Sequence, residues 1–436
     1  RLGVAADHVL VDHHLGDVLQ ARQFVHRVEQ HRLEDRAQAA RAGLALDGPG
    51  RDGLEGIGRE AQLHVVQFEQ LLVLAHQGVL RLLENLLERD LIKVLEGGDQ
   101  RVEHGVFGYS RPSPRLVELI IHRMQQRYGW KIDPEWLIFM PGVVPGLNFG
   151  IKAWCRQERN VITPKPVYYP FLHAPEYNDR AVSHLPMQLV NDRWLPDFDE
   201  LEKLALTADV LLLCNPHNPG GTVFTREELQ RIADIVLRHN LVVISDEIHC
   251  DLLLEPGVTH IPFASLSPEI AARSAVLMAP SKTFNIAGLC SSFAIIPDSR
   301  LRFKLQQAMR GLMADNNLIG LVAAEAAYEH GDEWLQAQLA YLHENRDLVI
   351  QKLSDLPGIK IAKLEATYLA WIDVSGLQFD DPIAAFEAGG VGLSPGAQFG
   401  DKHFVRLNFG CSRILLQQAL DRMVSVIQST PLANRA

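Results

Sequence analysis

The sequence predicts an α/β protein in which a mostly parallel β-sheet, with helices on both faces, is followed by a smaller α+β domain. Between residues 137 and 278, short runs that are apolar throughout alternate with helical segments, as strands buried on both faces do. After residue 316, long helices precede the strands instead, which is typical of an α+β arrangement. A length of 436 residues allows two or three domains.

We predict a large domain over residues 101–316 and a small C-terminal domain over 317–436, preceded by an anomalous segment over 1–100. This segment contains no Ser, Thr, Tyr, Trp, Cys or Met, and it has ten arginines against one lysine, Lys93. Ser and Thr supply most helix caps and turn bonds, so their absence is unusual for an evolved domain. Two interpretations stay open: a helical extension, or a wrong-frame or opposite-strand translation that is not native sequence. Reading all six frames of the DNA distinguishes them.

The large domain is predicted from apolar periodicity. Apolar residues at helical spacing indicate a helix over 114–128. Apolar strands are expected at 137–140, 160–163, 209–214, 241–248 and 275–278, and further helices at 145–154 and 225–240. Thr225 and Glu228 have the spacing of a capping box, in which each side chain satisfies a free backbone amide at the helix start.

The small domain is predicted in the same way. Helices are expected at 317–330 and 333–356, strands at 359–364, 368–374 and 404–409, and a closing helix at 413–430.

Composition excludes several classes of protein. A net charge of −11 without a basic stripe argues against a nucleic-acid partner. No apolar run approaches the roughly 18–20 residues of a membrane helix, and we see no secretory signal. Five scattered cysteines without a CxxC pair indicate reduced thiols and a cytoplasmic location, and we expect no metal site.

Polar residues follow three successive predicted strands. The strands at 209–214, 241–248 and 275–278 run into NPHNPGG, SDEIHCDL and PSKTFNIAGL. In an open parallel sheet, ligands bind beyond the carboxyl ends of the strands. Lys282 stands in the third segment, where a lysine is costly to bury unless it has a partner or a covalent use. A structural lysine and a covalent one both fit these residues.

Nine motifs, taken in order, resemble the fold-type I pyridoxal-phosphate enzymes of the class I/II aminotransferase-like group. The similarity is to the cystathionine β-lyase (C–S β-lyase) branch and extends from about Glu103 to the C-terminus. The motifs are HGVFGYS, PGVVPGL, PVYYPF, NPHNPGG, SDEIHCDL, PSKTFNIAGL, ATYLAW, SPGAQFG and FVRLNFG.

This resemblance implies pyridoxal 5′-phosphate as cofactor and a role for each matching residue. Lys282 resembles the lysine that forms a Schiff base with the cofactor and later moves the proton at the substrate Cα. Asp246 resembles the carboxylate that pairs with the ring nitrogen. Asn218 resembles the donor to the phenolic oxygen, with His249 near the same ring edge. A strand-end cap, a turn asparagine and a packed core histidine are the structural alternatives for the last three.

The remaining roles concern the ring face and the phosphate. Tyr168 is similar to the aromatic residue that stacks on the ring, although its neighbour Tyr169 is an alternative. The amides of Val143 and Val144, at a helix start, suit a phosphate, and Ser281 can add a hydroxyl.

Two further residues concern the partner subunit and the substrate. Tyr109 resembles the tyrosine that reaches the phosphate of the neighbouring subunit, which implies a homodimer with shared active sites. Arg406 resembles the arginine that binds the α-carboxylate of an amino-acid substrate, and a surface arginine is its structural alternative.

Two departures from the family pattern matter. Many aminotransferases of this fold have a phosphate-binding arginine eight residues after the lysine, where this chain has Cys290, and its loss points to the β-lyase branch. The family also has an aspartate-containing motif upstream of HGVFGYS, which we do not find in residues 1–100. This strengthens the interpretation that the segment is not native and puts the activity of this polypeptide in doubt.

The expected reaction is β-elimination from cysteine S-conjugates such as L-cystathionine, giving a thiol, pyruvate and ammonia. Transamination between an amino acid and a 2-oxo acid uses the same residues and is the alternative. A non-catalytic regulatory protein on the same fold is a third hypothesis, against which the presence of Lys282, Asp246 and Arg406 argues.

Overall fold

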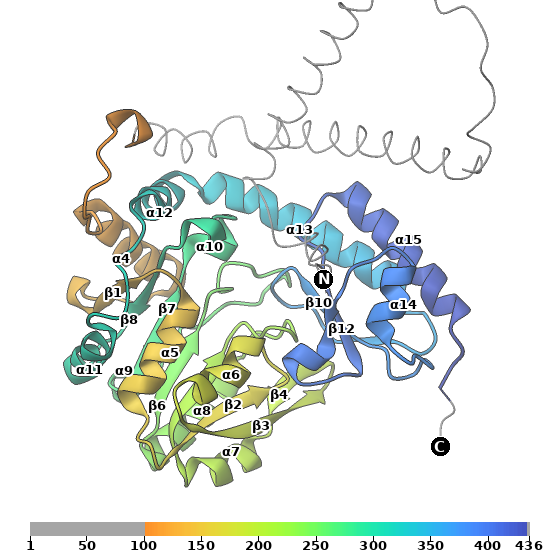
Figure 1. Ribbon diagram of the computed structural model, residues 1–436, viewed down its shortest axis with the longest axis horizontal. Helices are drawn as coiled ribbons and strands as arrows, with labels where there is room; N and C mark the ends of the chain where they lie inside the picture. The colour runs from red at the N-terminus through yellow and green to blue at the C-terminus, as the bar shows by residue number, and fades with distance from the viewer. Residues whose placement is uncertain (1–100, 434–436) are drawn as a thin grey trace, which may run out of the picture. The chain divides into compact units, whose positions relative to one another are not determined.

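The computed structural model describes residues 101–433, and the predicted anomalous segment over 1–100 lies outside them (Figure 1). The large sheet has eight strands in the order β1-β8-β7-β6-β5-β2-β3-β4. Their bounds are β1 (Leu137–Met140), β2 (Asn160–Lys165), β3 (Ala181–Val190), β4 (Arg193–Pro196), β5 (Ala208–Cys214), β6 (Val242–Asp246), β7 (Ser274–Met278) and β8 (Ser292–Ile295). Strands β2, β3, β5, β6 and β7 pair in parallel, and β1, β4 and β8 pair antiparallel to their neighbours. The predicted mostly parallel sheet is confirmed.

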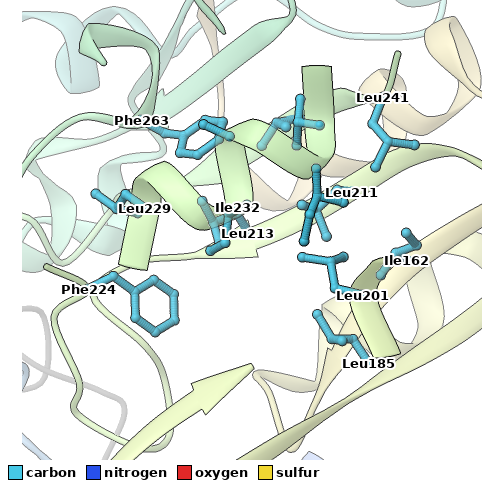
Figure 2. Close-up of a cluster of buried hydrophobic side chains, with 14 of the residues drawn as sticks. Ile162, Leu185, Leu201, Leu211, Leu213, Phe224, Leu229, Ile232, Leu241 and Phe263 are labelled. Atoms are coloured by element: carbon cyan, nitrogen blue, oxygen red, sulfur yellow. The ribbon is translucent and has the colours of Figure 1, made fainter. Parts of the chain in front are cut away.

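Helices bury both faces of this sheet. Along β5, Leu211 and Leu213 belong to one apolar cluster, whereas Val210 and Leu212 belong to another, because successive side chains point to opposite faces. Figure 2 shows the first cluster, to which α7 and α8 contribute. The helices of this face are α7 (Phe198–Ala205), α8 (Arg226–His239) and α9 (Pro268–Ala271), and those of the other are α5 (Val143–Trp154), α6 (Tyr169–Tyr177) and α11 (Ser299–Met309).

The helices predicted most accurately have strong caps. Helix α4 (Pro114–Tyr128) begins after Ser113, whose side chain accepts a hydrogen bond from the Leu116 amide at 2.9 Å, and it ends at Gly129 in the left-handed region. Helix α8 begins with the predicted capping box of Thr225 and Glu228. The helix predicted from residue 145 begins two residues earlier, as α5.

The strand predicted over 241–248 ends early, and the reason bears on the site. Strand β6 stops at Asp246, because the Ile248 amide donates to Asp246 Oδ1 at 3.1 Å. The buried Glu247 carboxylate accepts from Ser245 Oγ at 2.7 Å and from the Phe263 amide at 2.9 Å. One main-chain bond still follows the sheet after Asp246, from the Glu247 amide to the Leu277 carbonyl at 2.9 Å, and Asp246 is the last strand residue.

The C-terminal part contains a four-stranded antiparallel sheet in the order β11-β12-β10-β9. The elements are α12 (Leu318–His330), α13 (Asp332–Leu353), β9 (Lys360–Ile361), β10 (Leu369–Asp373), α14 (Pro382–Ala388), β11 (Ser394–Pro395), β12 (Phe404–Asn408) and α15 (Arg413–Ser429). In Figure 1, α13 runs from the vicinity of α12 to α15. The predicted strand over 359–364 is shorter, as β9, and the helix over 333–356 ends at Leu353.

Some elements were not predicted. These are α6, α7, α9, α11 and α14, the strands β3, β4, β8 and β11, and the one-turn helix α10 (Pro280–Thr283). Strands β3 and β4 lie at the edge of the sheet, where much of β3 is exposed, so they lack the continuous apolar run of a central strand. Asn191 and Asp192 join them with φ of 50° and 60°, as the two central residues of a type I′ hairpin turn require.

Main-chain hydrogen bonds join residues 365–367 to the loops that follow β5 and β6. The Gly221 carbonyl accepts from the amides of Glu365 (3.1 Å) and Ala366 (2.9 Å). The Thr367 amide donates to the Leu252 carbonyl at 2.8 Å, and the Leu254 amide donates to the Glu365 carbonyl at 2.8 Å. The segment that precedes β10 is thereby fixed against the large sheet.

Within residues 101–433, no helix combines the length and the apolar character needed to cross a membrane.

Candidate active site

The structure brings the three predicted strand ends together at one edge of the sheet. Strands β5 and β6 pair with Cys214 opposite Asp246, and β6 and β7 pair with Asp246 opposite Leu277. The segments that follow them carry Asn218, His249 and Lys282. Parallel neighbours therefore place these polar residues side by side, as the sequence predicted.

Asp246 is a buried carboxyl group, and 3% of its surface is exposed. Its pKa is raised to about 7, chiefly by burial and also by the neighbouring Glu247 charge, while the Ile248 amide and Lys282 act in the opposite direction. An anion at this position lacks water around it. A cationic group bound beside it would stabilise the carboxylate.

Lys282 lies in α10 and is half-buried. Its positive charge lowers the pKa of both Asp246 and His249, so it acts electrostatically on both. The lysine that the sequence singled out is therefore near the strand-end carboxylate and the buried imidazole.

His249 is a buried, neutral imidazole. Its pKa is lowered to about 3, chiefly by burial and also by the charges of Lys282 and Arg406. Its Nδ1 atom is buried and has no hydrogen-bond partner among the described residues. The Tyr368 ring contacts it in an edge-to-face arrangement, with the ring centroids 6.0 Å apart. Because an unsatisfied buried nitrogen costs free energy, a ligand that hydrogen-bonds Nδ1 would be favoured.

Arg406 of the small sheet contacts Asn218, which lies in the loop after β5 of the large sheet. Arg406, on β12, donates from Nη1 to Asn218 Oδ1 at 3.1 Å and from Nη2 to Ser394 Oγ at 3.3 Å. Its guanidinium lies 4.4 Å from the centroid of the Phe399 ring. A residue of the small sheet thus reaches the loop that follows β5.

Tyr168 and Tyr169 differ in their environment. Tyr168 is half-buried at the start of α6, and its amide donates to the Asn218 carbonyl at 2.9 Å. Burial raises its pKa, as do its neighbour Tyr169 and the charge of Asp246. Tyr169 is 44% exposed. The geometry therefore associates Tyr168 with the other predicted residues and leaves Tyr169 at the surface.

The predicted phosphate ligands are at helix starts. Val143 and Val144 are the first residues of α5, so their amides have no acceptor within the helix, and Pro145 after them has no amide hydrogen. Ser281 is half-buried and precedes Lys282 in α10. Tyr109 is fully exposed in the single chain.

Sequence reasoning missed two residues that contact this group. Tyr368, which packs on His249, stands in the ATYLAW motif, which was the only available signal. Ser394, which accepts a hydrogen bond from Arg406, stands in SPGAQFG. Neither motif shows by itself which of its side chains faces the site.

Comparison with known proteins gives consistent matches. Residues 78–423 match the family model described as aminotransferase class I and II. The chain is 39% identical over 343 residues to the cystathionine β-lyase PatB of Bacillus subtilis (strain 168), and the match covers 77% of this chain and 88% of that protein.

Two solved structures are similar to this chain in sequence and in fold. The structure of OvoB is 47% identical with a TM-score of 0.76, covering 78% of this chain and 90% of that one. Cystalysin from Treponema denticola, whose structure contains a pyridoxal 5′-phosphate cofactor, is 31% identical with a TM-score of 0.74, covering 77% and 87%.

Proposed function

Since this chain belongs to the class I and II aminotransferase family, we propose that it uses pyridoxal 5′-phosphate to catalyse β-elimination from cysteine S-conjugates such as L-cystathionine. The products are a thiol, pyruvate and ammonia. The observation that carries the choice of a lyase is the likeness to the cystathionine β-lyase of Bacillus subtilis over most of that protein. The exposed Cys290, at the position where many aminotransferases have an arginine, supports the same choice.

The residues of this chain fit the cofactor. Asp246 is a buried carboxylate that a protonated ring nitrogen would stabilise, and His249 Nδ1 is a buried atom in need of a partner. The amides of Val143 and Val144 at the positive end of the α5 dipole suit a phosphate, to which Ser281 would add a hydroxyl. We assign Tyr168 to the ring face and Asn218 to the phenolic oxygen.

When bound, the cofactor supplies an electron-poor ring that stabilises negative charge at the substrate Cα. Side chains of the protein bind the substrate and transfer its proton. Arg406 binds the α-carboxylate, Asp246 keeps the ring nitrogen protonated, and Lys282 Nζ takes the proton from Cα. The Cβ–S bond then breaks and the sulfur leaves as the thiol. Overall, L-cystathionine and water give homocysteine, pyruvate and ammonia.

The test is an assay without any 2-oxo acid. The purified protein with its cofactor and L-cystathionine should release pyruvate and thiol in equal amounts, measured by coupled reduction of pyruvate and by a thiol reagent. A strict requirement for a 2-oxo acid acceptor would overturn the lyase and favour transamination. The control is Lys282→Ala, which should remove the yellow colour of the bound cofactor and lower the rate by at least ~10²-fold. A colourless wild-type protein, unchanged by added cofactor, would favour the non-catalytic hypothesis.

We also propose a cytoplasmic homodimer with shared active sites. The full exposure of Tyr109 in the single chain supports the dimer, because the resemblance assigns this side chain to the neighbouring subunit. The five cysteines, all free, support the location.

A further inference from the structure

A buried ion pair adjoins the turn that carries Lys282. At its centre is Asp251, whose side chain is 5% exposed. Its carboxylate accepts hydrogen bonds from Arg123 Nη2 at 2.9 Å, Tyr128 Oη at 3.0 Å and Thr283 Oγ1 at 3.1 Å. Although burial alone would raise the pKa of Asp251, Arg123 and Arg127 hold it below its usual value. The group is therefore a fixed anion with three donors.

The residues immediately after Lys282 both contact this cluster. Thr283 bonds Asp251, and the guanidinium of Arg123 lies 5.6 Å from the centroid of the Phe284 ring. Both residues are buried. Helix α10 is a single turn, so it has few hydrogen bonds of its own to fix its position. The contacts of Thr283 and Phe284 therefore help to fix the backbone of Lys282, together with the main-chain bonds from Phe284 to Pro280 and from Ile286 to Ser281.

The cluster also reaches α13. Asp332, the first residue of that helix, accepts from Arg123 Nη1 at 3.0 Å and from Arg127 Nη2 at 2.7 Å. Farther along, α13 contributes Leu342 and Val349 to the apolar core of the C-terminal sheet. The guanidinium of Arg123 thus bonds both Asp251, which accepts the hydrogen bond of Thr283, and the first residue of α13, whose side chains pack in the core of the small sheet.

We propose that Thr283 is a positioning residue for Lys282: its hydrogen bond to the Asp251–Arg123 pair sets the place from which Lys282 Nζ acts. This rests on the proposed function only in taking Lys282 as the reactive lysine. It does not depend on which amino acid is the substrate. The competing explanation is that Thr283 merely satisfies a buried carboxylate and so stabilises the fold.

Two variants of the full-length holoenzyme separate these explanations. Thr283→Ser keeps the hydroxyl, whereas Thr283→Val keeps the shape and removes the donor. We expect Thr283→Val to lower kcat roughly ten- to hundredfold with little change in KM, since small displacements of a reacting group have effects of this order. Its visible circular-dichroism band, which reports the orientation of the bound cofactor, should change in amplitude. Thr283→Ser should match the wild type within about twofold in both measurements.

Thermal unfolding of the cofactor-free proteins is the control for stability. A Thr283→Val protein with a lower Tm but the wild-type dichroism and kcat would overturn the proposal. If wild-type protein shows no lyase activity but Thr283→Val still alters the dichroism band, the positioning role stands and only the substrate class fails. Should Thr283→Val not fold, Thr283→Ala against Thr283→Ser gives the same comparison of hydroxyl with no hydroxyl.

Discussion

At the scale of single residues, Asp246 and His249 have opposite effects on how the free energy of unfolding changes with pH. The folded pKa of Asp246 is raised to about 7, above the value of about 3.9 in an unfolded chain. Between these values the folded protein holds a proton that the unfolded chain has lost, so this carboxyl makes the protein less stable as the pH rises. His249, with a pKa lowered to about 3, contributes stability that increases as the pH rises toward about 6.5.

Asp246→Asn isolates the first of these effects. Because His249 is present in both proteins, the difference in unfolding free energy between the variant and the wild type reports Asp246 alone. As the pH rises from 5 to 8, the unfolding free energy of the cofactor-free variant should increase by roughly 2–4 kcal/mol relative to that of the wild type. Urea unfolding at half-unit pH steps measures it, and parallel curves for the two proteins would contradict it. The variant should also bind the cofactor more weakly.

Arg406→Lys tests the substrate side of the site. A lysine keeps the charge but loses the two-point geometry that suits a carboxylate. We expect kcat/KM to fall about ten- to hundredfold, chiefly through KM, with the visible spectrum of the bound cofactor unchanged. Steady-state kinetics measures it, with Arg300→Lys, at an exposed ion pair, as the matched control. An unchanged KM would remove Arg406 from the substrate site.

A site residue can be predicted from the sequence when it stands at the end of a recognisable strand. Asp246 ends an apolar strand and Lys282 follows another, so the topology of a parallel sheet predicts that they converge. Asp251 is different, because its partner Arg123 lies 128 residues away in the chain. No local pattern shows that pairing, and only the tertiary structure, in which α4 contacts the segment after β6, reveals it.

At the scale of elements, the most accurate predictions combine a side-chain cap with a clear apolar period. A cap alone was not enough, since the capped helices α7, α11 and α14 were not predicted. Ser113 and Thr225 cap α4 and α8, and both helices begin where the sequence predicts. By contrast, β6 ends at Asp246, where the Ile248 amide donates to the Asp246 side chain, and apolar periodicity does not report this bond.

Gly320→Ala is expected to disturb the short turn Ala287–Leu289, which follows the helix of Lys282 in the chain. Gly320 is buried in α12, where an added Cβ would lie 2.1 Å from the Leu289 carbonyl oxygen. In an open helix this change stabilises by about 0.5–1 kcal/mol, whereas here the overlap should cost about 1–3 kcal/mol. Thermal unfolding and the visible spectrum of the cofactor measure it.

The matched control for that change is Gly288→Ala. No atom lies within 4 Å of a Cβ at Gly288, which stands in the same turn that Gly320 contacts. We expect this variant to unfold at the wild-type temperature. Equal stability of the two variants would show that α12 can shift away from the turn.

At the scale of the whole molecule, the site depends on parts that a single sheet does not supply. Arg406 of the small sheet bonds Asn218 beside the large sheet, so both are needed to complete it. Tyr109 is exposed, and so are its neighbours Val106 and Phe107. We propose that the partner subunit covers these three side chains.

A mixed dimer tests the proposed sharing of sites. Chains carrying Tyr109→Ala and chains carrying Lys282→Ala are co-expressed with different tags, and the mixed dimer is purified. One of its sites then has both residues intact, so it should show about half of the wild-type activity, while each parent dimer is well below this. A mixed dimer no more active than its parents would contradict the shared site, and a monomer in light scattering would exclude it.

The main-chain bonds between Gly221, Leu252 and residues 365–367 have a consequence for how this enzyme changes over evolutionary time. They join the two sheets through peptide groups, so the side chains of Tyr368 and Ser394 take no part in them, although Gly221 is in the left-handed region that favours glycine. Tyr368 and Ser394 can therefore be exchanged without loosening the join. Variant libraries at these two positions should yield altered substrate preferences at little cost in Tm. Residues beside the site could then change while the contact between the two sheets stays intact.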